Sequence, residues 1–247
     1  MKRDGATDPP LPLAGGAGGG QRADPATDAS GHRARLRARL IAGGPEALLD
    51  HELVEYLLAL AIPRRDTKPL ARRLIAEFGS YGALLSADAT TLAKAGLSES
   101  VIAALKIAQA SALRLLKSGI ADQPILSSWQ ALIDYLHADM AHRMIERARV
   151  LHLDTRNRLI RDELISEGTI DQSAIHVREI VKRALELGSA SIILVHNHPS
   201  GDPSPSRQDI AITRDIVLAL KPLNIQVHDH VVIGSTGHAS LRAMGLL

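Results

Sequence analysis

The chain has 247 residues, of which 45% are hydrophobic and 23% are charged, values typical of a folded protein with one or two domains. It contains no cysteine, which excludes disulfides and thiolate zinc sites and fits a reducing, cytoplasmic location. No run of about 18 uncharged apolar residues occurs, so we expect no membrane span. The net charge is only +2, so any strongly basic character must be local.

Composition divides the chain into four segments. Residues 1–30 are rich in Gly, Pro, Ala, Asp and Thr, and bury too little apolar surface to offset their ordering entropy, so we expect a disordered tail. Residues 33–117 follow a helical period interrupted by turns, which predicts a small all-α domain. We interpret residues 118–125 as a linker, and residues 126–247 as a second domain.

The second domain mixes helices and strands without regular βαβ repetition. Alternating residues before and after the turn at 155–158 predict a hairpin, and a later apolar run predicts a buried strand. This pattern indicates an α/β domain with a mixed sheet. We expect helices at 127–137 and 173–187, and strands at 147–154, 159–167, 190–195 and 226–234.

Two histidines at the end of the predicted strand 190–195 are candidate metal ligands. His196 and His198 are two residues apart, so their side chains leave a strand on the same face. Asp209 lies at the start of the next helical run. Two imidazoles and one carboxylate supply three ligands, which leaves a tetrahedral zinc with one open position for water. The arrangement predicts a catalytic rather than a structural zinc site.

Ser206 lies three residues before Asp209 and begins the helical run. Ser-x-x-Asp is similar to a capping box, with Ser206 as the N-cap. The box normally ends in Glu or Gln, and the shorter Asp is suited to reach a metal above the strand end. The alternative is that both residues only cap the helix.

A second histidine pair, His228 and His230, alternates on the predicted strand 226–234. Only Asp229 accompanies the pair, and His-x-His on a solvent-facing strand is usually unliganded. We therefore expect no second metal site there.

These motifs resemble those of a known family. His196-Asn197-His198-Pro199 followed by Ser206 and Asp209 resembles the JAMM motif of the MPN/JAB metalloproteases. The longer strings at 196–203 and 205–209, with 176–180 upstream and 229–234 downstream, resemble the RadC family within that group. The resemblance covers about residues 33–247.

The resemblance implies an MPN/JAB-like (cytidine-deaminase-like) mixed sheet that holds Zn²⁺ through His196, His198 and Asp209. It implies hydrolysis of a peptide or isopeptide bond in a protein or peptide substrate, with Ser206 also hydrogen-bonding either the developing oxyanion or the zinc-bound water. Such enzymes use a general base, a glutamate from an earlier strand. We favour Glu163 for this role over Glu167, and a third alternative is that neither acts as the base.

The turn at residues 95–100 resembles a helix-hairpin-helix DNA-binding module, which RadC proteins carry near their N-termini. Ser98 replaces the usual second glycine, and Glu99 would repel a phosphate. Residues 61–120 hold nine Lys or Arg against four Asp or Glu, which favours phosphate contact. Non-specific DNA binding through residues 33–117 and a plain helical adaptor both remain open. The alternative function is therefore a DNA-repair-associated module with a zinc scaffold and little peptidase activity.

Overall fold

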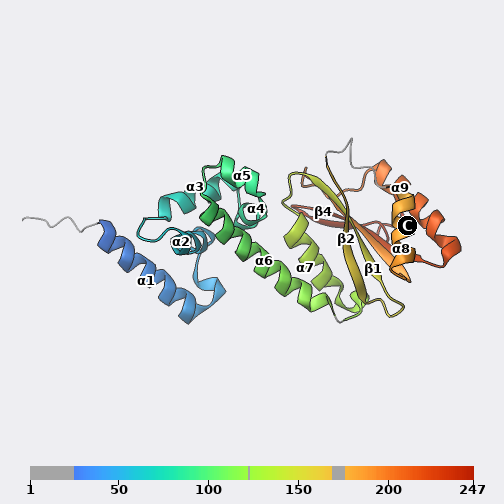
Figure 1. Ribbon diagram of the computed structural model, residues 1–247, viewed down its shortest axis with the longest axis horizontal. Coiled ribbons are helices and arrows are strands. Elements are labelled where there is room, and N and C mark those ends of the chain that lie inside the picture. The colour runs from blue at the N-terminus through green and yellow to red at the C-terminus, as the bar shows by residue number, and fades with distance from the viewer. Residues whose placement is uncertain (1–24, 122, 169–175) are drawn as a thin grey trace, which may run out of the picture.

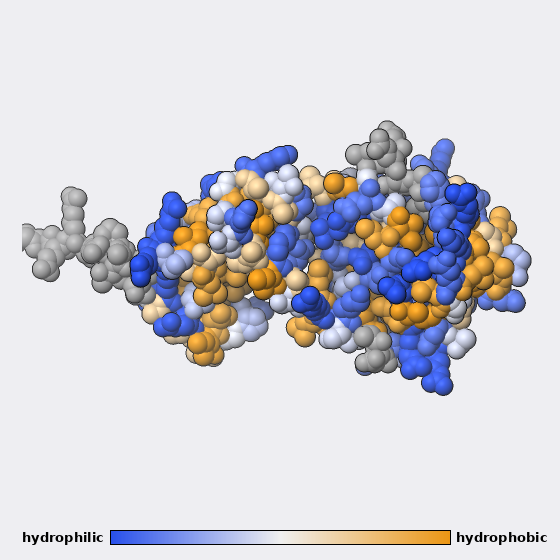
Figure 2. Space-filling view, viewed as in Figure 1, coloured by the Kyte–Doolittle hydropathy of each residue, from blue (hydrophilic) through white to orange (hydrophobic). Residues whose placement is uncertain are grey.

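The computed structural model describes residues 25–121, 123–168 and 176–247, which form two lobes joined along one long helix (Figure 1). The helical lobe comprises the first six α-helices and the sheet lobe comprises the rest. On the face seen in Figure 2, hydrophobic residues lie among hydrophilic ones on both lobes. The architecture confirms the prediction of an α/β domain with a mixed sheet behind a helical region.

Short helices joined by tight turns build the helical lobe. Ser80 and Asp88 cap two of them by accepting hydrogen bonds from backbone N–H groups, and Gly79 ends a third with φ of 83°. Leucines dominate the buried core. The elements are α1 (Pro25–Gly43), the 3-10 turn η1 (Pro45–Ala47), α2 (Asp50–Ala61), α3 (Lys68–Phe78), α4 (Tyr81–Ser86), α5 (Ala89–Lys94) and α6 (Glu99–Ala121).

Two predicted boundaries differ from the structure at the helical lobe. Helix α1 begins at Pro25, inside the segment predicted to be a tail; proline fits the first helical position, and the Arg-, Ala- and Leu-rich run from residue 33 provides the strong helix formers. Residues 1–24 of that predicted tail lie outside the described residues. Helix α6 continues through residues 118–121, where a linker was predicted. Ile120 explains this continuation, since its side chain is fully buried in the core of the sheet lobe.

In the described part of the sheet lobe, five strands lie in the order β2-β1-β3-β4-β5. Only β3 and β4 are parallel, and every other neighbouring pair is antiparallel. The hairpin of β1 and β2 turns at Asn157, whose φ of 59° suits asparagine. The strands are β1 (Glu146–Leu153), β2 (Leu159–Gly168), β3 (Ser191–Asn197), β4 (Gln226–Gly234) and β5 (Gly237–Ser240).

Helices cover both faces of this sheet. Helix α7 (Trp129–Met140), preceded by the turn η2 (Ile125–Ser128), packs on one face together with the end of α6. Helices α8 (Val177–Glu186) and α9 (Arg207–Leu220), the latter followed by η3 (Lys221–Leu223), pack on the other. Figure 1 shows α7 on the side of the helical lobe and α8 and α9 on the far side. None of the described helices is long and apolar enough to cross a membrane.

Candidate metal centre

Strand β3 delivers both histidines to the face that α9 covers. His196 is 1% exposed and pairs with Ala148 of β1, whereas His198 follows the last residue of the strand. The loop after His198 is held by a close backbone approach: a Cβ on Gly234 would meet the Gly201 carbonyl oxygen at 2.2 Å. Gly201 itself has φ of 88°. Glycine at both positions therefore lets the loop lie against the end of β4.

Ser206 and Asp209 form the predicted capping box at the start of α9. The Ser206 hydroxyl accepts from the Asp209 N–H at 3.1 Å, and the Asp209 carboxylate accepts from the Ser206 N–H at 2.7 Å. The cap fixes the rotamer of Asp209 and turns its carboxylate toward β3. Capping and metal ligation are therefore compatible roles for Asp209.

The three predicted ligands converge. The Nε2 atoms of His196 and His198 are 3.0 Å apart, and the Asp209 carboxylate oxygens lie 3.3 Å from the first and 3.6 Å from the second. Bonds of about 2.0–2.1 Å in a tetrahedron place ligand atoms about 3.3 Å apart. Among the described residues this is the one group of three or more His, Asp or Glu side chains close enough to hold a metal ion.

The second nitrogen of His198 fixes its tautomer. Nδ1 of His198 lies 2.9 Å from the carbonyl oxygen of Asp202, which can only accept a hydrogen bond. Nδ1 therefore carries the proton, and the lone pair of Nε2 points at the other two ligands.

A relay of three hydrogen bonds fixes the tautomer of His196. The Thr213 hydroxyl lies 2.5 Å from the Asp209 carbonyl oxygen and must donate to it. The same hydroxyl therefore accepts from Nδ1–H of His230 at 2.6 Å. Nε2 of His230 is then an acceptor and receives Nδ1–H of His196 at 2.8 Å. Nε2 of His196 is left with a free lone pair.

The neutral state of His230 agrees with the relay, and Asp209 is charged. Burial and the neighbouring His196 lower the pKa of His230 to about 3, so His230 is neutral at physiological pH. Burial alone would raise the pKa of Asp209, but contact with the His196 and His198 rings holds that pKa far below its usual range, so Asp209 is a carboxylate. The same contact with Asp209 raises the pKa of His198. The centre is thus an anionic pocket that favours a positive charge.

The donor set fits a zinc ion. Two imidazole lone pairs and a carboxylate face one another at 3.0–3.6 Å, an arrangement that repels unless a cation lies between them. Neutral imidazole and carboxylate are ligands that zinc accepts in catalytic sites with three protein ligands.

The structure does not bring Glu163 to this centre. Glu163 lies in β2 opposite Val150. Its two carboxylate oxygens share the Nε–H of Arg183 in α8, at 2.8 and 2.9 Å, and the carboxylate lies 3.7 Å from His152. An acid so engaged is part of a structural contact between β2 and α8.

Glu167 is also directed elsewhere, since it pairs with Arg147 at 2.6 Å. A third glutamate, Glu146, is the first residue of β1 and lies two residues before Ala148, the partner of His196. Alternation along β1 therefore puts Glu146 on the face of the metal ligands. Its negative charge contributes to the raised pKa of His198.

The other histidine pair does not share a face. The register between β3 and β4 shifts at His228, so Ile192 pairs with Val227 and Ile193 with Asp229. His230 joins the relay, whereas His228 bonds Asn157 at 2.7 Å.

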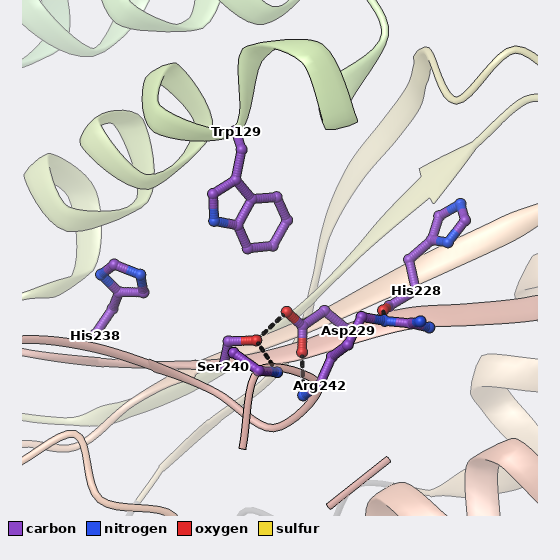
Figure 3. Close-up of a pocket in the computed structure, with 7 residues that line it drawn as sticks. Trp129, His228, Asp229, His238, Ser240 and Arg242 are labelled. Carbon is purple, nitrogen blue, oxygen red and sulfur yellow. Dashed lines mark hydrogen bonds between the residues drawn. The ribbon is translucent and has the colours of Figure 1, made fainter. Parts of the chain in front are cut away.

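A hollow of about 510 Å³ opens beside His228 (Figure 3). On its floor the Asp229 carboxylate accepts from the Ser240 hydroxyl and the Arg242 N–H, and the ring of His228 points away from both. Trp129 lies over the hollow. The bonds of Asp229 join the end of β5 to β4 and provide no converging metal ligands.

Comparison with known proteins places these features in one family. Residues 126–246 match the model of the RadC-like JAB domain. A UPF0758 protein of Rhodobacter capsulatus is 52% identical over 213 residues, which are 86% of this chain and 100% of the relative. Another UPF0758 protein, from Ruegeria pomeroyi, is 48% identical over 217 residues, 87% of this chain and 97% of the relative.

Proposed function

The chain belongs to the RadC family, and from that premise we propose that its sheet lobe is a zinc-dependent hydrolase of peptide or isopeptide bonds. The convergence of His196, His198 and Asp209 with both imidazole lone pairs turned inward is the observation that carries the proposal. When bound, zinc supplies a Lewis acid that polarises a carbonyl and lowers the pKa of water to about 7.

We assign the general base to Glu146 in place of Glu163. Glu146 shares the strand face of the ligands, whereas Glu163 is held by Arg183. The Glu146 carboxylate is suited to take a proton from the attacking water and to return it to the leaving amine.

Ser206 is suited to stabilise the oxyanion. Its oxygen accepts from the Asp209 N–H at 3.1 Å, so the hydroxyl proton remains free to donate toward a substrate carbonyl oxygen. The hydroxyl also caps α9, and its position is therefore fixed before substrate arrives.

Two matched substitutions test this function on zinc-loaded protein with fluorogenic peptides and an isopeptide-linked substrate. Glu146→Gln should keep its zinc and lose about 10²–10⁴-fold in hydrolysis rate, because a general base contributes that much. Glu163→Gln should stay near the wild-type rate. The proposal fails if wild-type protein hydrolyses no amide bond, and the choice of base fails if Glu163→Gln is the inactive variant.

A second candidate function, non-specific DNA contact, is favoured by one observation in the helical lobe. Arg33 of α1 donates to the Arg65 carbonyl, which holds the start of α1 next to the turn of the exposed Arg64 and Arg65. Arg35 and Arg37 are also exposed on α1. We expect duplex DNA to be retained at low salt and released as salt rises, because such contacts release counterions. If immobilised DNA does not retain the protein at low salt, or if retention does not change with salt, the helical lobe is an adaptor and not a DNA-binding module.

A further inference from the structure

A cleft of about 350 Å³ lies between the two lobes and has residues of both in its lining. Phe78, Ala83 and Ala87 line it from the helical lobe, and Met144 and Ile145 line it from the segment that precedes β1. We call this space the interlobe cleft.

The cleft exposes an unusual amount of apolar side chain. Met144 is 78% exposed and Ile145 is 46% exposed, although they are adjacent and both face the cleft. Large apolar side chains gathered at a concave surface mark a binding site more often than a scattered exposed residue does. Methionine is flexible and polarisable, so it adapts to apolar partners of different shape.

The wall of the cleft is tied to the metal strand through Asn197. This residue lies between the ligands His196 and His198, and its side chain is fully buried. Its amide donates to the Ile145 carbonyl at 3.2 Å, and its Oδ1 accepts from the Arg147 N–H at 2.9 Å. Ile145 and Arg147 flank Glu146. By alternation along β1, Arg147 faces the helical lobe and Glu146 faces the metal ligands, so the cleft and the general base lie on opposite faces of the sheet at the start of β1.

The charged side chains that line the cleft favour a polypeptide over a nucleic acid as its ligand. Its lining contains three carboxylates, of Glu77, Asp88 and Glu167, and two guanidinium groups, of Arg143 and Arg147. Each arginine is already paired with an acid, Arg143 with Asp139 and Arg147 with Glu167. A surface without excess positive charge is poorly suited to a phosphate backbone. An apolar side chain of a polypeptide fits it better.

We propose that the interlobe cleft binds a large apolar side chain of the peptide substrate a few residues away from the scissile bond. The inference rests on the proposed function and gives the helical lobe a part in substrate recognition. Met144 and Ile145 hold the side chain on one wall, and Phe78 does so on the other. The substrate backbone then passes round the start of β1 to reach the metal centre on the other face of the sheet.

The test measures binding to full-length, zinc-loaded Glu146→Gln protein by fluorescence anisotropy, so that bound peptide is not cleaved. The probe is a fluorescein-labelled decapeptide library with Leu fixed at the centre, and the comparison library has Asp there. We expect the Leu library to bind about tenfold or more tightly than the Asp library, since a buried leucine side chain contributes that much affinity.

Met144→Glu should weaken binding of the Leu library by about tenfold or more for the same reason. Met244→Glu is the matched control, because Met244 is an exposed methionine outside the cleft, at 54% exposure, and should change nothing. Equal binding by the two variants overturns the inference. So does an absence of peptide binding, or a loss of duplex DNA binding in Met144→Glu with peptide binding intact.

The two proposals fail separately. If peptide binding depends on Met144 but the protein has no hydrolytic activity, the role of the cleft is supported and the proposed function is contradicted. If the protein hydrolyses peptides and Met144→Glu changes neither the rate nor KM, the role of the cleft is contradicted and the proposed function is supported.

Discussion

Thr213 offers a way to disrupt the metal centre without altering a ligand. Its hydroxyl both donates to the Asp209 carbonyl and accepts from His230, which keeps the proton of His230 on Nδ1. Thr213→Val keeps the shape of the side chain and removes that acceptor. His230 can then carry its proton on Nε2, opposite the Nδ1–H of His196. We expect zinc affinity to fall about 10–100-fold, the usual cost of losing a partner behind a metal ligand.

Competition with a chromophoric chelator measures this affinity, and Thr213→Ser is the control because it retains the hydroxyl. If Thr213→Val binds zinc as tightly as wild type, the relay does not set the tautomer of His196. Equal losses in both variants point to packing around the buried Thr213 as the cause instead.

Residues differ in how far sequence alone could assign them. The shared face of His196 and His198 was predictable because both lie at one strand end, where local alternation sets the direction of the side chains. The capping box that orients Asp209 was predictable because it is also local. The place of Glu146 beside them was not predictable, since it depends on β1 pairing beside β3, some 50 residues along the chain. Thr213 and His230 come together only when α9 packs on β4.

Strands and helices were predicted largely in place because their signals are periodic. The hairpin of β1 and β2 follows the predicted turn, and β3 and β4 follow their apolar runs. The position of Glu163 in β2 could be predicted from the sequence, but its ion pair with Arg183 could not. Arg183 of α8 comes next to Glu163 only when α8 packs on the sheet. The register shift between β3 and β4 at His228 likewise breaks the alternation of His228 and His230 that the sequence indicated.

At the scale of the whole molecule, the largest difference between the sequence-based prediction and the structure is the length of α6. Ser118 and Gly119 read as a linker, yet the helix continues so that Ile120 enters the core of the sheet lobe. Lys117 lies 4.0 Å from Asp162 and near the Tyr135 ring, which adds polar contacts to the same junction. The two lobes therefore share a helix, and the interlobe cleft lies on a continuous scaffold.

Zinc content is the measurement that tests the account most directly. Wild-type protein, purified without a metal-binding tag and dialysed against metal-free buffer, should contain one zinc ion per chain by elemental analysis. Asp209→Ala should contain almost none, because only the two imidazoles of His196 and His198 remain as protein ligands. Glu146→Gln should keep full zinc. A wild-type protein without zinc, or full zinc in Asp209→Ala, contradicts the metal centre.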